Sequence, residues 1–196
     1  MTEMKVLNAI AKARSIRRYK EDIQVTTEQL EYIVNSTRFV GSAGNRQTLR
    51  YMLVNDKETC DKIFEEISFA AKLKPEWNGP AEGERPNAYI VVMTDTEPTI
   101  NTAIDMGLAA EAMLLTATQE GLGGCLFRSF DPAKLGEKLG KAPYMPALVI
   151  SIGYPDEVVI LQCARDYKCL DNPSYHRDMY GHHIVCKLPL DAIIIK

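Results

Sequence analysis

The stretch TINTAIDMGLAAEAMLLTATQEGLGGCLF, residues 99–127, decides the fold. Apolar side chains lie on nearly every side of it between Ala103 and Ala117. An α-helix that is apolar on most sides is expected to be buried on most sides. At 1.5 Å per residue this helix would be about 30 Å long. Gly121 suits the end of a helix, and Gly123 and Gly124 lead into a short strand. We therefore expect a long central helix that is followed directly by a strand.

Helix and strand patterns alternate on both sides of this stretch. Residues 4–13 are typical of a short amphipathic helix, with Leu7, Ile10 and Ala11 on one face. Thr26 and Gln29 form a plausible capping box for a second helix. Further strands are predicted at 51–54, 88–94 and 147–152, further helices at 57–70 and 132–140, and a long loop rich in proline and glycine at 72–87.

Length and composition indicate one soluble domain over residues 1–196. The mass is 22.0 kDa, with 46% hydrophobic and 25% charged residues, close to the average for soluble proteins. No apolar run reaches the ~18 residues of a membrane span. The first residues lack the apolar core of a signal peptide. We expect a cytoplasmic protein.

Charge is distributed unevenly along the chain. The net charge is −3, which argues against general nucleic-acid binding. The first twenty residues nevertheless carry six lysines and arginines against one acidic residue. A local basic cluster on an acidic protein favours a small anionic ligand over a polyanion.

The first candidate binding segment is Arg14-Ser15-Ile16-Arg17-Arg18-Tyr19. Guanidinium groups and a serine hydroxyl are the groups that bind a phosphate. Taken alone, the same residues also fit the solvated basic end of the first helix. From the segment alone, both the phosphate site and the solvated helix end stay open.

Two further segments carry small or polar residues that suit a ligand. In Gly41–Gln47, the amides of Asn45 and Gln47 offer donors and acceptors together, as the edge of a heterocyclic ring requires. Gly123 and Gly124 could offer backbone N–H groups to a planar ligand. The alternatives are a polar helix-to-strand turn and a tight turn after the central helix.

Cysteine and histidine patterns support neither a disulfide framework nor a metal site. The five cysteines include no Cys-x-x-Cys pair, so we expect mostly buried free thiols. All three histidines lie in the last forty residues together with three of the cysteines, but no spacing matches a zinc site. No Gly-x-Ser-x-Gly motif is present, which argues against a hydrolase of that type.

In their joint order, these segments resemble the FMN-dependent nitroreductase family. The family has an Arg-Ser-x-Arg-x-aromatic segment, a Ser-x-x-Asn-x-Gln turn, a Glu-Arg-Pro-x-Ala-Tyr-Ile strand start, an Asp-x-Gly-x-Ala-Ala helix followed by Gly-Leu-Gly, a Gly-Tyr-Pro turn and, in some members, a His-His-x-x-x-Lys segment. These motifs are matched in order at 14–19, 42–47, 84–90, 105–110, 121–123, 153–155 and 182–187.

The resemblance implies an α+β fold with a mainly antiparallel central sheet packed by helices. It implies a homodimer with FMN in each of two interface clefts. The C-terminal extension, about residues 156–196, would wrap around the partner subunit as a domain-swapped tail. The activity would be an FMN-dependent NAD(P)H oxidoreductase. Hydride would pass from NADH or NADPH through flavin N5 to an electron-poor acceptor, such as a nitroaromatic or quinone, in ping-pong fashion.

The resemblance also assigns roles to individual residues. No protein residue would be catalytic in itself, because flavin N5 carries the chemistry. Arg14, Ser15 and Arg17 would contact the phosphate and the pyrimidine side of FMN, and Lys187 would add a second phosphate contact. The turn with Ser42, Asn45 and Gln47 would contact the isoalloxazine or ribityl groups. Gly123 and Gly124 would approach the N5 edge. Arg17 would further stabilise the anionic reduced flavin.

Some positions depart from the family pattern and motivate alternatives. Ala13 and Leu188 stand where many members carry arginine. One alternative is therefore a flavin-binding or apo interaction protein on the same fold without efficient turnover. Another is a thiol redox protein that uses Cys163 and Cys169, although their spacing matches no redox motif. Trp77, in the loop at 72–87, fits either ligand stacking or packing.

Overall fold

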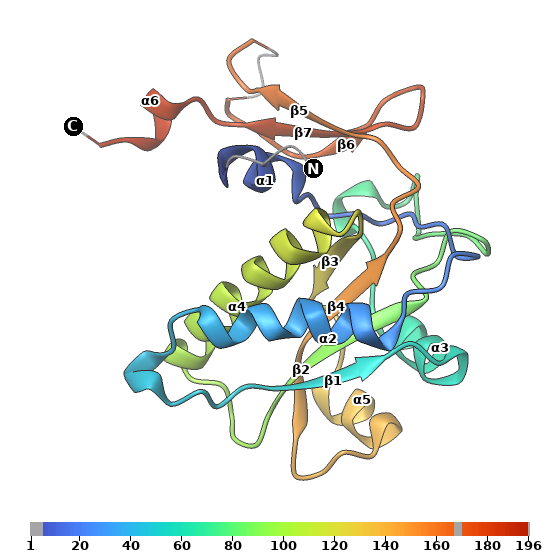
Figure 1. The fold of residues 1–196 in the computed structure, drawn as a ribbon. Helices are drawn as coiled ribbons and strands as arrows, with labels where there is room; N and C mark the ends of the chain where they lie inside the picture. Colours follow the sequence, from blue (N-terminus) through green and yellow to red (C-terminus); the bar gives the residue numbers. More distant parts are fainter. Residues whose placement is uncertain (1–5, 167–169, 196) are drawn as a thin grey trace.

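The computed structural model describes residues 6–166 and 170–195, in which helices and strands alternate (Figure 1). The α-helices are α1 (Val6–Lys12), α2 (Thr27–Asn35), α3 (Lys57–Glu66), α4 (Ile100–Gln119), α5 (Pro132–Leu139) and α6 (Leu190–Ile193). The strands are β1 (Arg50–Val54), β2 (Ala88–Thr94), β3 (Gly123–Phe127), β4 (Met145–Gly153), β5 (Val159–Cys163), β6 (His176–Arg177) and β7 (His183–Lys187). Short 3-10 turns are η1 (Ser36–Phe39), η2 (Ala43–Asn45) and η3 (Ala71–Leu73). None of the described helices is both long and apolar enough to cross a membrane.

The centre of the fold is a four-stranded sheet in the order β1-β2-β4-β3. Every neighbouring pair is antiparallel. All residues of β2 are buried, as are all residues of β4 after Met145, because helices cover both faces of these inner strands. The predicted α+β class, with a mainly antiparallel sheet packed by helices, is confirmed.

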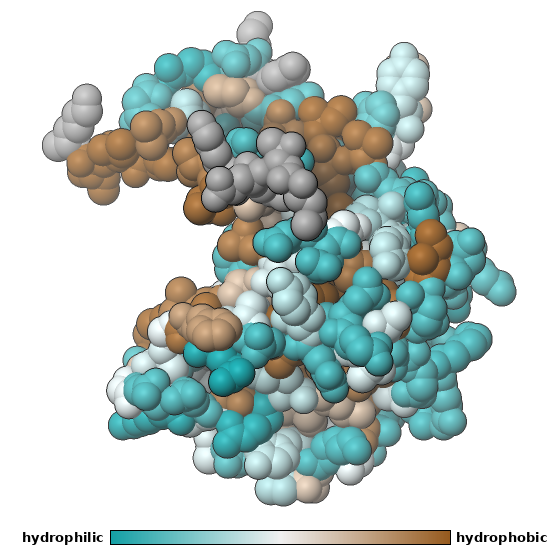
Figure 2. Space-filling view, viewed as in Figure 1, coloured by the Kyte–Doolittle hydropathy of each residue, from teal (hydrophilic) through white to brown (hydrophobic). Residues whose placement is uncertain are grey.

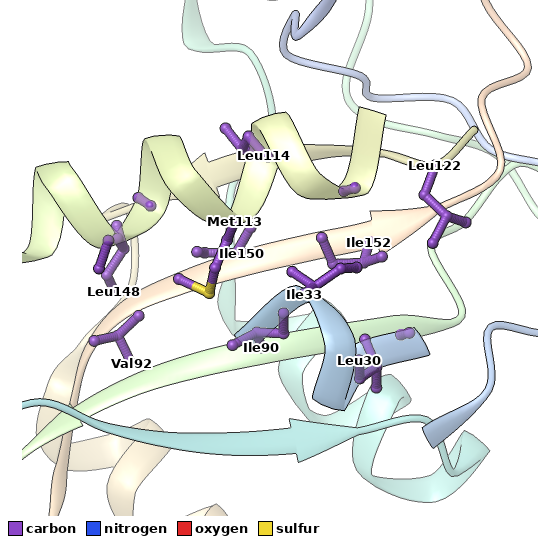
Figure 3. Close-up of a cluster of buried hydrophobic side chains, with 14 of the residues drawn as sticks. Leu30, Ile33, Ile90, Val92, Met113, Leu114, Leu122, Leu148, Ile150 and Ile152 are labelled. Carbon is purple, nitrogen blue, oxygen red and sulfur yellow. The ribbon is translucent and has the colours of Figure 1, made fainter. Parts of the chain in front are cut away.

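Alternation along the inner strands creates two apolar layers. One face packs against α2 and α4 (Figure 3). The other face packs against α3 and α5. The first layer includes Leu30, Ile33, Ile90, Met113 and Ile150, and the second includes Ile63, Tyr89, Val91, Leu135 and Val149.

Helix α4 has the predicted ends but not the predicted burial. Its N-terminus carries a capping box of Thr99 and Thr102, and Gly121 follows its end with a φ of 76°. The sheet and α2 cover one side only. Ile100, Ile104 and Leu108 are 79%, 57% and 46% exposed, so the expectation of burial on most sides is wrong for the single chain. These residues, spaced four apart, form an apolar stripe along the free side of α4.

Two other helices differ from the sequence prediction. Helix α3 ends at Glu66 instead of residue 70, because Ile67 has the extended backbone angles −96° and 151°. Helix α1 has no buried residue, and Leu7 and Ile10 of its predicted apolar face are exposed. Among the described residues, no element buries this face.

Strands β5, β6 and β7 form a second sheet, which no pattern in the sequence predicted. Strand β7 pairs in parallel with β5 and antiparallel with β6. This C-terminal sheet packs on its own chain, where Asp156 donates its N–H to the Arg18 carbonyl (3.0 Å) and the Arg177 guanidinium lies 4.9 Å from the Trp77 ring. Helix α6 projects away from the body (Figure 1). Wrapping of this tail around a partner stays a prediction.

Replacing Gly124 with alanine should destabilise the fold. A Cβ atom at this position would lie 2.4 Å from the Ser151 carbonyl oxygen and 2.9 Å from Leu114 Cδ2, so β3 must shift away from β4. Overpacking of this kind costs about 1–3 kcal/mol of unfolding free energy. Gly41→Ala is the matched control, because no atom lies within 4 Å of its added Cβ. Equal urea midpoints for the two variants would contradict the close packing of β3 on β4.

Candidate functional site

The Arg14–Tyr19 segment is anchored in the core by its last residue. Tyr19 is fully buried, and its hydroxyl contacts Ser151 Oγ (2.6 Å) and the Ile16 carbonyl. The backbone of Tyr19 also forms a bridge with Pro155. A Cβ on Gly153 would lie 2.7 Å from the Tyr19 ring. The aromatic residue of the first motif and the glycine of the Gly-Tyr-Pro turn are therefore packing partners.

The same segment runs along the start of β3. Ser15 bridges to Gly124 in parallel, and Ile16 donates its N–H to the Gly124 carbonyl (2.9 Å). A Cβ on Gly123 would lie 2.5 Å from Ile16 Cγ1. Both glycines are buried, and a Cβ on Gly124 would meet the Ser151 carbonyl of β4 instead of the basic segment. The structure brings Gly123 and Gly124 together with the basic segment; their contact with a flavin stays a prediction.

Arg14 and Ser15 face the more open side of this cluster. Arg14 is half-buried, and its Nη2 donates to the Ile10 carbonyl at the end of α1 (2.7 Å). Its Nε is buried and has no hydrogen-bond partner. Ser15 is exposed. A guanidinium with an unused donor beside an exposed serine suits a phosphate oxygen.

Arg17 is turned toward the C-terminal sheet instead of solvent. Its exposed fraction is 9%, and its Nη1 lies 3.1 Å from His183 Nε2 and 3.4 Å from the Ser15 carbonyl oxygen. The guanidinium also lies 5.0 Å from the centre of the Tyr175 ring. The Glu157 carboxylate accepts the backbone N–H of Arg17. Sequence reasoning missed His183, Tyr175 and Glu157, because only the fold brings them to Arg17.

Lys187 lies apart from the other basic residues. It is exposed at the far end of β7, four residues after His183. At ~3.3 Å per residue, the strand carries its backbone about 13 Å beyond that histidine. No contact joins it to Arg14, Ser15 or Arg17 among the described residues, and its phosphate role stays a prediction.

The second predicted segment is organised by Asp105 of α4. The Asp105 carboxylate accepts from Ser42 Oγ (2.7 Å) and from the Ala43 N–H (3.0 Å). Ser42 Oγ in turn accepts the Gln47 N–H (3.0 Å), and Gln47 Nε2 donates to Asn45 Oδ1 (3.0 Å). Asp105 therefore holds this turn in place.

The turn has an unusual backbone. Asn45 and Gln47 have φ values of 53° and 50°, in the left-handed region that residues other than glycine seldom adopt. Such conformations cost of order 1–3 kcal/mol each and concentrate at functional sites. The Asp105 and Ser42 hydrogen bonds hold the backbone in place, so the amides of Asn45 and Gln47 are presented in a fixed arrangement.

A cavity of about 210 Å³ lies beside this turn. Ser42, Asn45 and Gln47 line it, as predicted for binding residues. Sequence reasoning missed Arg38 and Arg50, two further lining residues that add positive charge. Neither arginine belongs to a motif, because Arg38 precedes and Arg50 follows the Ser-x-x-Asn-x-Gln turn.

Apart from Lys187, the predicted site residues therefore form two separate half-sites. The first half-site is the Arg14–Arg17 segment with Gly123 and Gly124, beyond the C-terminal end of α4. The second half-site is the turn Ser42–Gln47, near the N-terminal end of the same helix at Asp105. From Asp105 to Gln119 the helix spans about 21 Å. Within one chain, α4 keeps the two half-sites apart.

Trp77 and the cysteines have structural surroundings. The Trp77 ring packs edge-on against Phe69, with centroids 6.3 Å apart, which favours the packing interpretation.

Cys60 and Cys125 are buried free thiols. Burial raises the pKa of Cys60 to about 12 and also raises the pKa of Cys125. Such thiols are inert at neutral pH. Cys163 is free and partly buried, Cys186 is disulfide-bonded, and Cys169 lies outside the described residues. No cluster of three potential metal ligands occurs within 6–166 and 170–195.

Comparisons with known proteins agree with this fold. The model of the nitroreductase family matches residues 10–154. An Archaeoglobus fulgidus protein named "Putative NADH dehydrogenase/NAD(P)H nitroreductase" is 29% identical over 162 residues, covering 77% of this chain and 86% of the relative. An FMN-dependent nitroreductase from Clostridium difficile superposes with a TM-score of 0.61 at 27% identity, covering 78% and 88% of the two chains.

A fourth comparison spans the whole length of the chain. A nitroreductase structure from Desulfovibrio desulfuricans, which was solved in complex with FMN, superposes with a TM-score of 0.69 at 23% identity. It covers 100% of this chain and 98% of the other, so the C-terminal segment shares the fold too. The family match covers well over half of the chain. The chain belongs to the nitroreductase family.

The buried histidine makes stability depend on pH. Burial, with Arg17, Arg177 and His176 close by, lowers the pKa of His183 from 6.5 to about 4. Below pH 6.5 the unfolded chain binds a proton that the folded chain does not, so stability falls as the pH falls. Between pH 7 and pH 5, wild-type protein should lose about 2 kcal/mol more unfolding free energy than His183→Gln. Urea denaturation at both pH values measures this difference, and equal losses would show that folding does not lower the pKa of His183.

Proposed function

We propose that this protein is an FMN-dependent NAD(P)H oxidoreductase. The observation that carries the proposal is the pair of half-sites, one basic and one rich in amides, on a nitroreductase fold. The residues fit FMN: Arg14 has a buried donor without a partner, and the turn at Asn45 and Gln47 presents side-chain amides in a held left-handed backbone. When bound, FMN would supply hydride transfer at N5.

The chain's own residues would bind and orient the cofactor. Arg14 and Ser15 would take the phosphate, with Lys187 as a second cation from the C-terminal segment. Arg17 would face the pyrimidine edge, where a fixed positive charge stabilises an anionic reduced ring. Ser42, Asn45 and Gln47 would contact the isoalloxazine or ribityl groups. Gly123 and Gly124 would approach the ring through their backbone.

We further propose that each complete site forms between two chains. The two half-sites lie at opposite ends of α4, and the Ile100, Ile104 and Leu108 stripe leaves the free side of that helix apolar. In a symmetric dimer the same patch meets itself about a two-fold axis. Antiparallel packing of two α4 helices would bring the turn of one chain toward the basic segment of the other.

The surface supports this assembly. A hollow separates the C-terminal layer from the body, and apolar residues line the tail beside it (Figure 2). The exposed apolar side chains of the tail are Leu190, Ile193, Ile194 and Ile195. Contiguous exposed apolar surface marks an interaction site. A second copy of this chain, wrapped by the tail, would cover it.

The donor would be NADH or NADPH and the acceptor a small electron-poor compound such as a nitroaromatic or quinone. The names of the A. fulgidus and C. difficile proteins support this class of reaction. Of the two cysteines in the thiol alternative, Cys163 is free and partly buried, and Cys169 lies outside the described residues.

An absorbance spectrum tests the cofactor and the reductive step together. Purified protein, reconstituted with FMN, should show flavin bands that bleach on anaerobic addition of NADH or NADPH. Bands that persist would favour a flavin-binding protein without turnover. Absence of flavin binding after reconstitution would contradict the proposal.

Mixing two defective variants tests the shared site. Arg14→Ala/Arg17→Ala and Asn45→Ala/Gln47→Ala each damage both sites of their own homodimer, so each should bind FMN weakly. A heterodimer of the two would contain one site with four altered residues and one intact site. Co-expression with two different affinity tags should therefore restore FMN binding to one site per pair of chains. No recovery in a purified heterodimer would show that each site is built within one chain.

A further inference from the structure

His183 makes an unusual hydrogen bond with Arg17. Its Nε2 lies 3.1 Å from Arg17 Nη1, and the imidazole is 1% exposed. Arginine donates hydrogen bonds and cannot accept them. His183 Nε2 must therefore carry a lone pair, which places the proton of the neutral ring on Nδ1. That Nδ1 is buried and has no hydrogen-bond partner.

The hydrogen bond with His183 uses only one side of the Arg17 guanidinium. Both of its hydrogen bonds, to His183 Nε2 and to the Ser15 carbonyl, start from Nη1. The parallel N–H groups of Nε and Nη2 have no such partner among the described residues. This edge is the one that binds a planar group with two adjacent acceptors.

Glu157 holds the backbone of the same segment. Its carboxylate is 1% exposed and accepts the N–H groups of Arg17 and Arg18. Its other oxygen pairs with Arg177 at 2.6 Å. Glu157 thus fixes the main chain of Arg17, and His183 fixes its guanidinium. Both residues belong to the C-terminal segment.

We propose that His183 is a positioning residue for Arg17. This inference rests on the function proposed above. His183 occupies Nη1 of Arg17, so that the Nε and Nη2 edge faces the pyrimidine ring of the flavin. Glu157 supports it by fixing the backbone. The C-terminal sheet then acts on the cofactor through Arg17, without touching it.

Two substitutions of His183 separate positioning from packing. His183→Gln keeps a neutral acceptor, whereas His183→Leu fills similar space without one. His182→Gln is the control, because His182 is half-exposed and its ring pairs with Asp178 instead of Arg17. In FMN-reconstituted dimers, His183→Leu should weaken FMN binding roughly tenfold, as expected for a lost charged contact. It should also make the flavin midpoint potential more negative, while His183→Gln and His182→Gln stay near wild type.

The outcomes distinguish a failure of this inference from a failure of the proposed function. If wild-type protein binds no FMN, the proposed function and the inference both fail. If wild-type protein binds FMN and His183→Leu keeps the wild-type potential, only the inference fails. Equal effects of His183→Leu and His183→Gln would indicate packing alone and also overturn it.

The hydrogen bond itself can be tested without flavin. Nitrogen-15 NMR of the imidazole in wild-type protein should show a proton on Nδ1, a hydrogen-bonded lone pair on Nε2, and no titration between pH 8 and pH 5. A proton on Nε2, or titration near pH 6.5, would overturn the proposed arrangement.

Discussion

The candidate site depends on the attachment of Tyr19 to the end of β4. Its hydroxyl reaches Ser151, its ring fills the space left by Gly153, and its backbone bridges to Pro155. This attachment fixes the chain direction of the preceding residues. Arg14, Ser15 and Arg17 have their positions because the fifth residue after Arg14 is locked into the core.

Helix α4 imposes the second constraint. One side of it seals the main apolar layer, and Asp105 on its first half organises the polar turn at residues 42–47. Its length separates that turn from the basic segment, while its free side is apolar. A single helix thus supplies core packing, the shape of one half-site, and a surface suited to a second copy.

Local signals in the sequence predicted the regular elements well. The capping box at Thr26 and the apolar runs of β2 and β4 are all confirmed. These features depend on neighbours a few residues away. The ordered motifs also identified the family, because each reports a local requirement such as a turn or a close backbone approach.

Features that depend on distant residues were not predictable. Periodicity shows that α4 is apolar on most sides but not which side its own chain covers. The second sheet was missed because its strands are short and interrupted by loops that contain Pro173 and Gly181. The partners of Arg17 lie 140 and 166 residues away at Glu157 and His183, so no local pattern could reveal them.

The Tyr19–Ser151 contact joins residues that are 132 positions apart in the chain. Protein synthesis proceeds from the N-terminus, so the basic segment leaves the ribosome long before the strand that anchors it. Until β4 has emerged, Tyr19 has no pocket, and the arginines beside it have no fixed orientation. The fixed orientation of these arginines is therefore acquired late, after nearly four-fifths of the chain has been made, and a nascent chain truncated before Ser151 would lack it.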